Sequence, residues 1–286
     1  MNTVLKIDLH MHTAVSDGTD APAELPAKVK AAGVDVFAVT DHDSVKACAA
    51  VGGAAAAAGL RFVPGVEFSC RDEQGKYHVL GYGFDPEAPA LTQIVEKGHR
   101  LRMTKVKARL DFLRTEFGFT FPEDEIARLL ALDNPGKPHI GNLMVQYGYA
   151  ESKEEAIERY INGVHFRNEY VRPEEAIAGV LGAGGVPVLA HPAYGSGDQL
   201  ILGKEMDARL RRLTDFGLKG IEAYYSGFTP KIRNELLTFA ERYDLLITAG
   251  SDYHGHNKLI ELGDTGLADG EPLPDRLQRF VDAVLP

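Results

Sequence analysis

Short apolar runs alternate with Ala-rich segments along the first 66 residues. The apolar runs predict strands at residues 3–9, 34–40 and 61–66, and the segments between them predict helices at residues 22–32 and 44–58. Gly33 and Gly59 follow the two helical segments, where glycine commonly ends a helix. This order of strands and helices predicts parallel pairing through right-handed crossovers.

The alternation breaks after the third strand. Residues 68–84 predict a hairpin, because Asp72-Glu73-Gln74-Gly75 is a turn signal between two β-rich arms. From residue 85 to residue 173 the chain is more polar and predicts helices at residues 90–117, 122–132, 139–147 and 153–162. The long helix carries an apolar stripe of Val106, Leu110, Leu113 and Phe117 at helical spacing. We therefore predict that residues 85–173 form an inserted small helical domain.

Strands and helices alternate again in the last third of the chain. The pattern predicts strands at residues 186–190, 219–223 and 245–249, and helices at residues 173–181, 204–216, 230–243 and 273–284. Six or seven strand–helix units predict an α/β barrel that is interrupted once. The barrel is predicted to comprise residues 1–84 and 174–286.

Composition and net charge limit which ligands the protein is expected to bind. The chain has 286 residues and a net charge of -10, which disfavours long nucleic acid as a ligand but leaves a small phosphorylated substrate open. Cys48 and Cys70 show no metal-binding spacing and are interpreted as buried thiols in a reducing compartment. No leader peptide or membrane-spanning run is apparent, so we expect a cytoplasmic protein with no membrane partner.

Histidines and carboxylates recur at the ends of the predicted strands. The candidates for metal ligands are His10, His12, Asp17, His42, Glu67, His78, His191, Asp252 and His254. A single such residue is more often structural, and the alternative for the whole set is a barrel with an unusually polar rim. Active sites of parallel barrels lie at the carboxyl ends of their strands, and such groups are costly to bury together without a cation. With no cysteine among the candidates, Mn, Fe or Zn fits the set, and nine candidates imply two or three ions.

Five motifs in this order resemble those of the polymerase-and-histidinol-phosphatase (PHP) family. They are His10-Met11-His12 with Asp17 downstream, Thr40-Asp41-His42-Asp43, Gly65-Val66-Glu67, Ala190-His191-Pro192, and Gly250-Ser251-Asp252-Tyr253-His254. The resemblance covers nearly all of the chain and is strongest to stand-alone phosphoesterases with a helical insertion. It implies a distorted (β/α)7 barrel, a centre of two or three divalent ions with Mn favoured, and an insertion that covers the substrate.

The resemblance also implies how the ligands are shared among the ions. One ion would take His10, His12, Glu67 and Asp252; a second would share Glu67 and take His78 and His191; a third would take Asp17, His42 and His254. Asp8 is either an acceptor for a ligand imidazole or a polar residue of the barrel interior. Glu222 matches no ligand of the family and is either a substrate contact or a supporting residue.

The implied reaction is hydrolysis of a phosphate ester by a metal-bridging hydroxide, with Asp252 among the catalytic residues. The proton for the leaving oxygen would come from His139 or His165, because the other candidate histidines are predicted ligands. The turn that contains Asn134, Lys137 and His139 leads into a helix start and predicts an anion site, with a solvated interhelix loop as the alternative.

Further contacts with the substrate are predicted elsewhere in the chain. Arg167 is expected to bind phosphate, and Tyr194 and Ser226 follow two strand ends and are expected to line the pocket. Arg102 and Arg109 flank the apolar stripe of the long helix. They belong either to a solvated basic face or to a site for a second, remote phosphate.

The leading hypothesis is a phosphoric ester hydrolase that acts on a nucleotide or sugar phosphate, with a bisphosphate and a cyclic phosphodiester among the candidates. The alternatives are an exonuclease on short RNA or DNA, a histidinol-phosphate phosphatase, and a non-catalytic metal-binding module. The complete set of candidate ligands disfavours the last of these.

Overall fold

Seven strands form the central barrel of the computed structural model, which describes residues 4–166, 168–195 and 199–285. The strands are β1 (Ile7–Asp8), β2 (Val36–Val39), β3 (Arg61–Asp72), β4 (Gly75–Tyr82), β5 (Val186–Leu189), β6 (Gly220–Tyr225) and β7 (Leu246–Gly250). They neighbour one another in chain order. The Leu9 N–H donates to the Ala249 carbonyl at 2.9 Å and thereby joins the first strand to the last.

One antiparallel strand distorts this otherwise parallel barrel. β4 runs antiparallel to both β3 and β5, whereas the other neighbouring strands are parallel. β3 continues without a break from Arg61 to Asp72, so the predicted third strand and the first arm of the predicted hairpin are one strand. The turn lies where the sequence predicts it, and Gly75 occupies it with a φ of 136°. The hairpin lets a single pair of strands present both Glu67 and His78.

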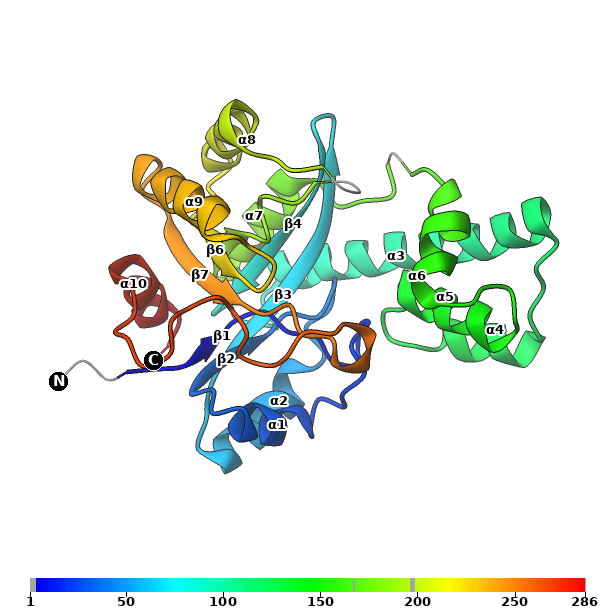
Figure 1. The fold of residues 1–286 in the computed structure, drawn as a ribbon, viewed down its shortest axis with the longest axis horizontal. Helices are drawn as coiled ribbons and strands as arrows, with labels where there is room; N and C mark the ends of the chain where they lie inside the picture. The colour runs from blue at the N-terminus through cyan, green and yellow to red at the C-terminus, as the bar shows by residue number, and fades with distance from the viewer. Residues whose placement is uncertain (1–3, 167, 196–198, 286) are drawn as a thin grey trace.

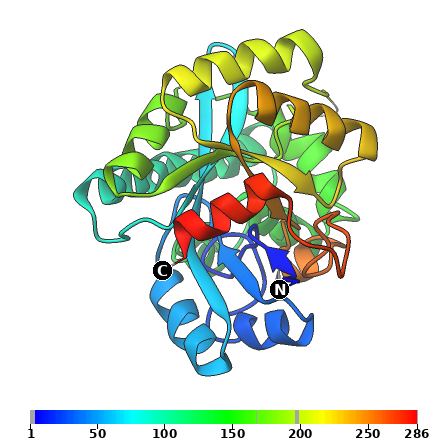
Figure 2. The same ribbon diagram turned by 90° about the vertical axis from the view of Figure 1, so that its left-hand side faces the viewer.

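Six helices pack around the barrel within the described residues (Figures 1 and 2). They are α1 (Leu25–Ala31), α2 (Cys48–Ala58), α7 (Pro173–Gly182), α8 (Gly203–Asp215), α9 (Pro230–Arg242) and α10 (Asp275–Val284). α10 lies on the side of the barrel away from the insertion, where Phe280 packs against Tyr82. Tyr82 is fully buried and donates its hydroxyl to the Leu9 carbonyl at 2.8 Å, which satisfies its polar atom inside the core.

The helical insertion projects from one side of the barrel (Figure 1). It contains α3 (Pro89–Phe117), α4 (Glu123–Leu130), α5 (Lys137–Gln146) and α6 (Lys153–Glu155), followed by a π-helical turn at Ala156–Tyr160 and a 3-10 turn at Ile161–Gly163. Its helices bury an apolar cluster of their own: Val106, Leu113, Leu129, Ile140, Leu143, Met144, Ala156 and Ile161. The insertion therefore has a separate core.

Helix α3 belongs to both cores. Leu91 in its first turns is buried in the core of the barrel, whereas Val106 and Leu113 are buried in the core of the insertion. Of the predicted apolar stripe, Phe117 at the distal end remains 41% exposed. One continuous helix thus joins the two units, and it carries Arg102 and Arg109 between them.

No helix among the described residues is both long and apolar enough to cross a membrane.

Candidate metal centre

The carboxylate of Glu67 lies at the centre of a group of five imidazoles. Its Oε2 is 3.3 Å from His10 Nε2, 3.1 Å from His12 Nε2 and 3.3 Å from His42 Nδ1. Its Oε1 is 2.7 Å from His78 Nδ1 and 3.0 Å from His191 Nε2. Both oxygens of one side chain therefore face potential ligands, as a carboxylate that bridges two ions requires.

Asp252 completes the group predicted for the first ion. Its Oδ1 lies 3.5 Å from His10 Nε2 and 3.3 Å from His12 Nε2. The ligand atoms of His10, His12, Glu67 and Asp252 all lie within 4.8 Å of one another. All four side chains are buried.

Asp17 organises a second group on the other side of His12. Its carboxylate is 3.3 Å from His254 Nε2, 3.7 Å from His42 Nε2 and 3.8 Å from His12 Nδ1. The predicted trio of Asp17, His42 and His254 is brought together, and His12 joins it. A third group contains His42, Glu67 and His78, with His191 Nε2 3.3 Å from His78 Nδ1.

The protonation chemistry of the cluster suits divalent ions. His10 Nε2, His12 Nε2 and His42 Nδ1 are buried without a hydrogen-bond partner. Burial opposes ionisation of Glu67 and Asp17, but the surrounding imidazoles hold the pKa of each carboxyl well below its usual range. Unpartnered imidazole nitrogens that point at ionised, buried carboxylates are costly unless a cation lies between them. The residues present therefore fit bound metal ions.

The backbone is strained where it presents these ligands. Asp43, His191 and Asp252 adopt positive φ angles of 49°, 25° and 60°, a conformation that non-glycine residues rarely adopt and that costs about 1–3 kcal/mol each. Gly250 precedes the last motif, and a Cβ there would lie 2.2 Å from the Cβ of His10. Only glycine lets β7 approach His10 this closely.

Glu222 is the acceptor that orients two ligands. It is fully buried, its Oε1 lies 2.9 Å from His10 Nδ1, and its Oε2 accepts the His191 backbone N–H at 2.6 Å. Asp8 instead accepts the hydroxyl and the N–H of Ser251, at 2.6 and 2.9 Å, so the imidazole acceptor is Glu222 and not Asp8. Acceptors of this kind fix the ring orientation of a metal-ligating histidine.

Sequence reasoning missed two residues that contact a candidate ligand. Lys258 Nζ lies 2.6 Å from Asp252 Oδ2, and the Tyr225 hydroxyl donates to the same oxygen at 2.9 Å. Burial disfavours the charged form of Lys258, but the Asp252 carboxylate raises its pKa above the usual value. The only sequence signal for Lys258 is its place shortly after the last motif, and Tyr225 lies two residues beyond the predicted strand at residues 219–223.

A cavity of about 630 Å³ opens beside the candidate ligands. It is lined by Arg71, Lys76, Tyr77, His78, Arg109, Lys137, Asn162, Val164, His165, Phe166, Tyr170, His191, Tyr194 and Gly195. The candidate ligands His78 and His191 thus share one cavity with four of the predicted substrate residues, namely Arg109, Lys137, His165 and Tyr194.

Other predicted substrate residues do not line this cavity. Asn134 is buried and donates its amide to the His42 and Asp43 carbonyls, at 2.8 and 3.1 Å. The Ser226 hydroxyl donates to the Ser251 carbonyl at 2.9 Å. Both side chains hold the backbone beside ligands. Arg167 lies outside the described residues.

His139 and Arg102 belong to the insertion, where Gly136 lies close to both Arg102 and the candidate ligand Asp17. His139 Nδ1 accepts the Gly136 N–H at 3.1 Å at the start of α5, and burial lowers the pKa of this histidine. Arg102 is 8% exposed, and its Nε donates to Asp43 Oδ2 at 3.1 Å. Arg109 is 6% exposed, so neither arginine belongs to a solvated basic face.

A group of five cationic side chains beside or near the cavity, which we call the cationic group, has no acidic partner. Among the described residues, no ion pair joins Arg71, Lys76, Lys105, Arg109 or Lys137 to a carboxylate. Lys105 Nζ instead lies 3.8 Å from the centre of the Tyr170 ring, and Arg109 lies over the Phe166 ring at 5.1 Å. Lys105 and Arg109 are buried, an unpaired buried cation is costly, and an anionic ligand would relieve that cost.

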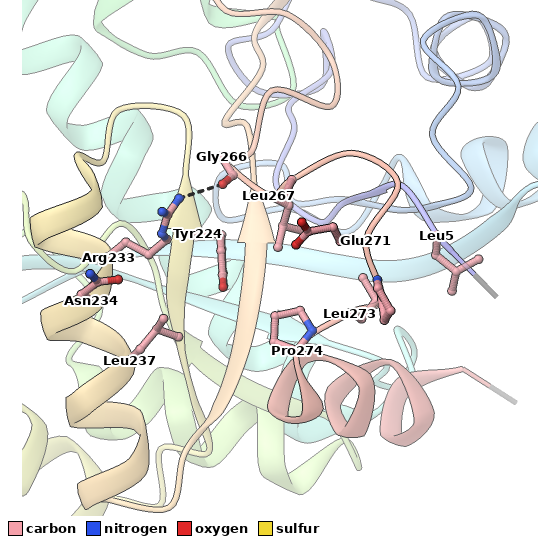
Figure 3. A pocket seen from close by; sticks show the side chains of 12 residues that line it. Leu5, Tyr224, Arg233, Asn234, Leu237, Gly266, Leu267, Glu271, Leu273 and Pro274 are labelled. Atoms are coloured by element: carbon pink, nitrogen blue, oxygen red, sulfur yellow. Dashed lines mark hydrogen bonds between the residues drawn. The ribbon is translucent and has the colours of Figure 1, made fainter. Parts of the chain in front are cut away.

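A separate cavity lies outside the barrel and contains none of the candidate ligands (Figure 3). It is bounded by α9 and by the segment before α10, and an Arg233 N–H donates to the Gly266 carbonyl across it. Leu237, Leu267 and Leu273 line much of its wall. Nothing in it resembles the chemistry of the metal-binding side of the barrel.

The chain is similar to known proteins over nearly its whole length. The family model described as PHP domain matches residues 8–284. A 5'-3' exoribonuclease of Haemophilus influenzae is 30% identical over 90% of this chain and 93% of its own length. A 3',5'-nucleoside bisphosphate phosphatase of Chromobacterium violaceum is 29% identical over 87% of each chain. A phosphoribosyl 1,2-cyclic phosphate 1,2-diphosphodiesterase of Eggerthella lenta is 31% identical over 87% of this chain and 94% of its own.

A solved structure shares the fold. A protein of Bifidobacterium adolescentis, described as a candidate metal-dependent phosphoesterase, matches with a TM-score of 0.82 and 28% identity over 100% of this chain and 99% of that one. The predicted distorted (β/α)7 barrel with a helical insertion is confirmed.

We expect Glu67→Gln and Asp17→Asn to lose metal to different extents. Glu67 contacts five histidines and Asp17 three, so elemental analysis after purification without chelators should show the larger loss of bound metal in Glu67→Gln. The exposed Asp244→Asn serves as the control and should keep the wild-type metal content. Equal metal content in Glu67→Gln and the wild type would contradict the assignment of Glu67 as the bridging carboxylate.

Proposed function

We propose, from the premise that the chain belongs to the PHP domain family of metal-dependent phosphoesterases, that it hydrolyses an ester of a small substrate with two phosphate groups. The observation that carries this proposal is the position of the cationic group, whose members Arg71, Lys76, Arg109 and Lys137 line the same cavity as His78 and His191. A nucleoside bisphosphate is the favoured substrate, in a cytoplasmic setting.

Two or three divalent ions, with Mn favoured over Fe or Zn, are proposed for the cluster of nine ligands. Bound there, such ions would lower the pKa of water and stabilise the charge on the phosphoryl group. Glu222 keeps the His10 ring and the His191 backbone in place for this task. Because the ligands are held by the barrel, the metal-binding geometry is fixed before substrate arrives.

The residues of the insertion would bind the rest of the substrate. Lys137 donates to the Asn162 side chain at the cavity wall, and a phosphate there would replace a neutral partner with an anionic one. His165 lines the cavity without being a candidate ligand, and it is the proposed proton donor to the leaving oxygen. His139 is the weaker candidate, because its Nδ1 is occupied by the Gly136 N–H and its pKa is lowered by burial.

The cationic group supports a substrate with a second phosphate over a simple monoester. One phosphate would be held at the metal ions. The unpaired charges of Arg109 and Lys137 then remain for a second anion. Burial, and after it the charges of Arg109 and Lys76, lower the pKa of Lys137 to about 8, and an anion bound beside this lysine would stabilise its charged form. The similarity to the bisphosphate phosphatase of Chromobacterium violaceum agrees with this substrate class.

Removal of terminal nucleotides from short RNA is the second candidate. The similarity to the exoribonuclease of Haemophilus influenzae favours it. A neighbouring cavity of about 590 Å³ shares Arg71 and Tyr170 with the first and offers room for a longer substrate. In that second cavity, however, Lys97 pairs with Glu175 and Arg172 pairs with Glu73, so its charge is largely balanced. This balance favours the smaller substrate.

The main test is hydrolysis of a panel of phosphomonoesters, nucleoside bisphosphates, sugar cyclic phosphates and short 5'-phosphorylated oligoribonucleotides, with Mn²⁺ present. Inorganic phosphate, ring-opened phosphomonoesters and released nucleotides are each quantified. We expect the highest kcat/KM for a nucleoside bisphosphate. A higher kcat/KM for the oligoribonucleotides would favour the exonuclease. If no member of the panel is hydrolysed, the proposed hydrolysis is refuted.

Arg109→Met and Lys137→Met should raise the KM for a bisphosphate by about 10- to 100-fold, because each removes a charge-assisted hydrogen bond of about 1.5–3 kcal/mol. The KM for a matched monoester should change little, since that substrate lacks the second phosphate. Lys97→Met is the control, because Lys97 pairs with Glu175 and does not line the main cavity. A rise of equal size for both substrates would place Arg109 and Lys137 at the scissile phosphate.

The binding of the second phosphate should weaken as the pH rises from 7 to 9. Lys137 has a pKa of about 8, so its positive charge is present below that pH and lost above it. The ratio of the KM for the bisphosphate to the KM for the monoester should therefore increase across this range. In Lys137→Arg the ratio should stay flat, because a guanidinium remains charged. A ratio that does not vary with pH in the wild type would exclude Lys137 from the phosphate site.

A further inference from the structure

The two oxygens of the Asp252 carboxylate lie in different surroundings. Oδ1 faces His10 Nε2 at 3.5 Å and His12 Nε2 at 3.3 Å, on the side of the candidate ligands. Oδ2 accepts from Lys258 Nζ at 2.6 Å and from the Tyr225 hydroxyl at 2.9 Å. Only one oxygen is thus free of hydrogen-bond donors.

Glu67 provides the contrast within the same cluster. Both of its oxygens face imidazoles, and among the described residues no lysine, arginine or tyrosine donates to it. The two carboxylates at the centre of the site therefore differ. One can share its oxygens between two ions, whereas the other has one oxygen already bound by a charged donor and a neutral donor.

The two donors are held in place by other contacts. Tyr225 ends β6, and its ring packs edge-on against the His191 ring at 5.7 Å. Lys258 follows the short helical turn Gly255–Asn257, and Asn257 Nδ2 donates to the Asp17 carbonyl at 2.8 Å. The ring packing fixes Tyr225, and the Asn257 contact fixes the backbone beside Lys258. Both contacts reduce the entropy lost when these donors bind the carboxylate and favour hydrogen bonds that set its orientation.

We propose that Tyr225 and Lys258 are positioning residues that restrict Asp252 to a single metal-ligating oxygen, Oδ1. This inference rests on the metal dependence in the proposed function, but it concerns metal binding alone and not the choice of substrate. A carboxylate that ligates through one oxygen leaves one more coordination position open on its ion than a carboxylate that ligates through two. Tyr225 and Lys258 thereby keep a position available for a substrate oxygen or a water.

The same geometry allows an alternative role for Lys258, namely direct contact with the substrate. Its side chain is 38% exposed, and together with Tyr225 it borders a small opening to His42, His78 and His191. From there it could contact the substrate directly and leave Asp252 unaffected. The experiment must therefore separate an effect on metal binding from an effect on substrate binding.

Mn²⁺ titration calorimetry on chelator-treated protein without substrate measures the first effect. Tyr225→Phe removes one donor to Asp252 without changing charge, and we expect roughly 10- to 100-fold weaker binding at one class of site. Tyr253→Phe is the matched control, because the Tyr253 hydroxyl donates at 2.8 Å to Asp20, which is not a candidate ligand. Its Mn²⁺ affinity should equal that of the wild type. Equal affinities for the wild type and Tyr225→Phe would overturn the proposal.

A crystal structure of the Mn²⁺-loaded protein is the direct measurement. In the wild type, Asp252 should ligate through Oδ1 only, and in the Tyr225→Phe/Lys258→Met double variant both oxygens should ligate. Ligation through both oxygens in the wild type would refute the restriction. Thermal unfolding of the metal-free variants, followed by circular dichroism, should match the wild type and exclude a general loss of structure.

Kinetics at saturating Mn²⁺ tests the competing role of Lys258. Under the proposal, Lys258→Met lowers kcat and leaves KM unchanged. A raised KM with an unchanged kcat would instead make Lys258 a substrate contact and would overturn its positioning role. The calorimetry needs no turnover. If none of the substrates is hydrolysed, the proposed function is refuted, whereas the metal-binding result for Asp252 and Tyr225 still holds.

Discussion

The rest of the structure depends on one constraint, which is the burial of an ionised carboxylate among five imidazoles. Glu67 is 1% exposed, and its oxygens lie within 3.3 Å of nitrogens from five histidines. Such an arrangement is stable only if a cation balances the charge and the surrounding backbone prevents the groups from relaxing away. The barrel supplies the second condition, because strands from distant parts of the chain are hydrogen-bonded into one closed wall.

The strain at this site is local and has identifiable support. The positive φ angles of His191 and Asp252 are unfavourable for residues with a Cβ, yet each residue is held by neighbouring contacts. The His191 N–H is bound by Glu222, and the Asp252 N–H donates to the His10 carbonyl at 2.8 Å. The energy for these conformations comes from the packed core around the barrel, whose apolar residues are fully buried.

The insertion is coupled to the metal ligands by direct contacts and not merely by proximity. Asn134 binds the backbone of the His42 segment, and Arg102 binds Asp43 in the same segment. One rigid helix, α3, extends from the core of the barrel to the core of the insertion and carries the charged side chains between them. The insertion therefore places three members of the cationic group, Lys105, Arg109 and Lys137, at a fixed position relative to the candidate ligands, and in the proposed function this placement selects the size and charge of the substrate.

The order of strands and helices could be predicted because each element is encoded by local periodicity. Most candidate ligands could be predicted because they follow a strand, and parallel strands present their carboxyl ends on one side, whereas Glu67 and His78 lie within β3 and β4. The five motifs thus specified eight of the candidate ligands, the predicted hairpin supplied the ninth, His78, and the structure brings all nine together. The continuity of β3 through Asp72 was missed, because the charged Glu67 separates the predicted strand at residues 61–66 from the predicted hairpin at residues 68–84, although the long ladder with β4 spans it.

Contacts between residues far apart in the chain were decided only by the tertiary structure. Glu222 and His10 are 212 residues apart, and no local pattern distinguishes a buried acceptor for an imidazole from a substrate contact. Asn134 was predicted at an anion site from its place in a turn, and Ser226 was predicted at the pocket from its place after a strand end. In the structure both side chains hold backbone carbonyls. The burial of Arg102, Lys105 and Arg109 depends on which face of α3 meets the barrel, and that face is chosen by packing. The sequence by itself determined the elements and the set of candidate ligands, because these depend on local spacing. Which polar side chains support the ligands, and which remain unpaired for a substrate, depended on long-range packing that local spacing does not encode.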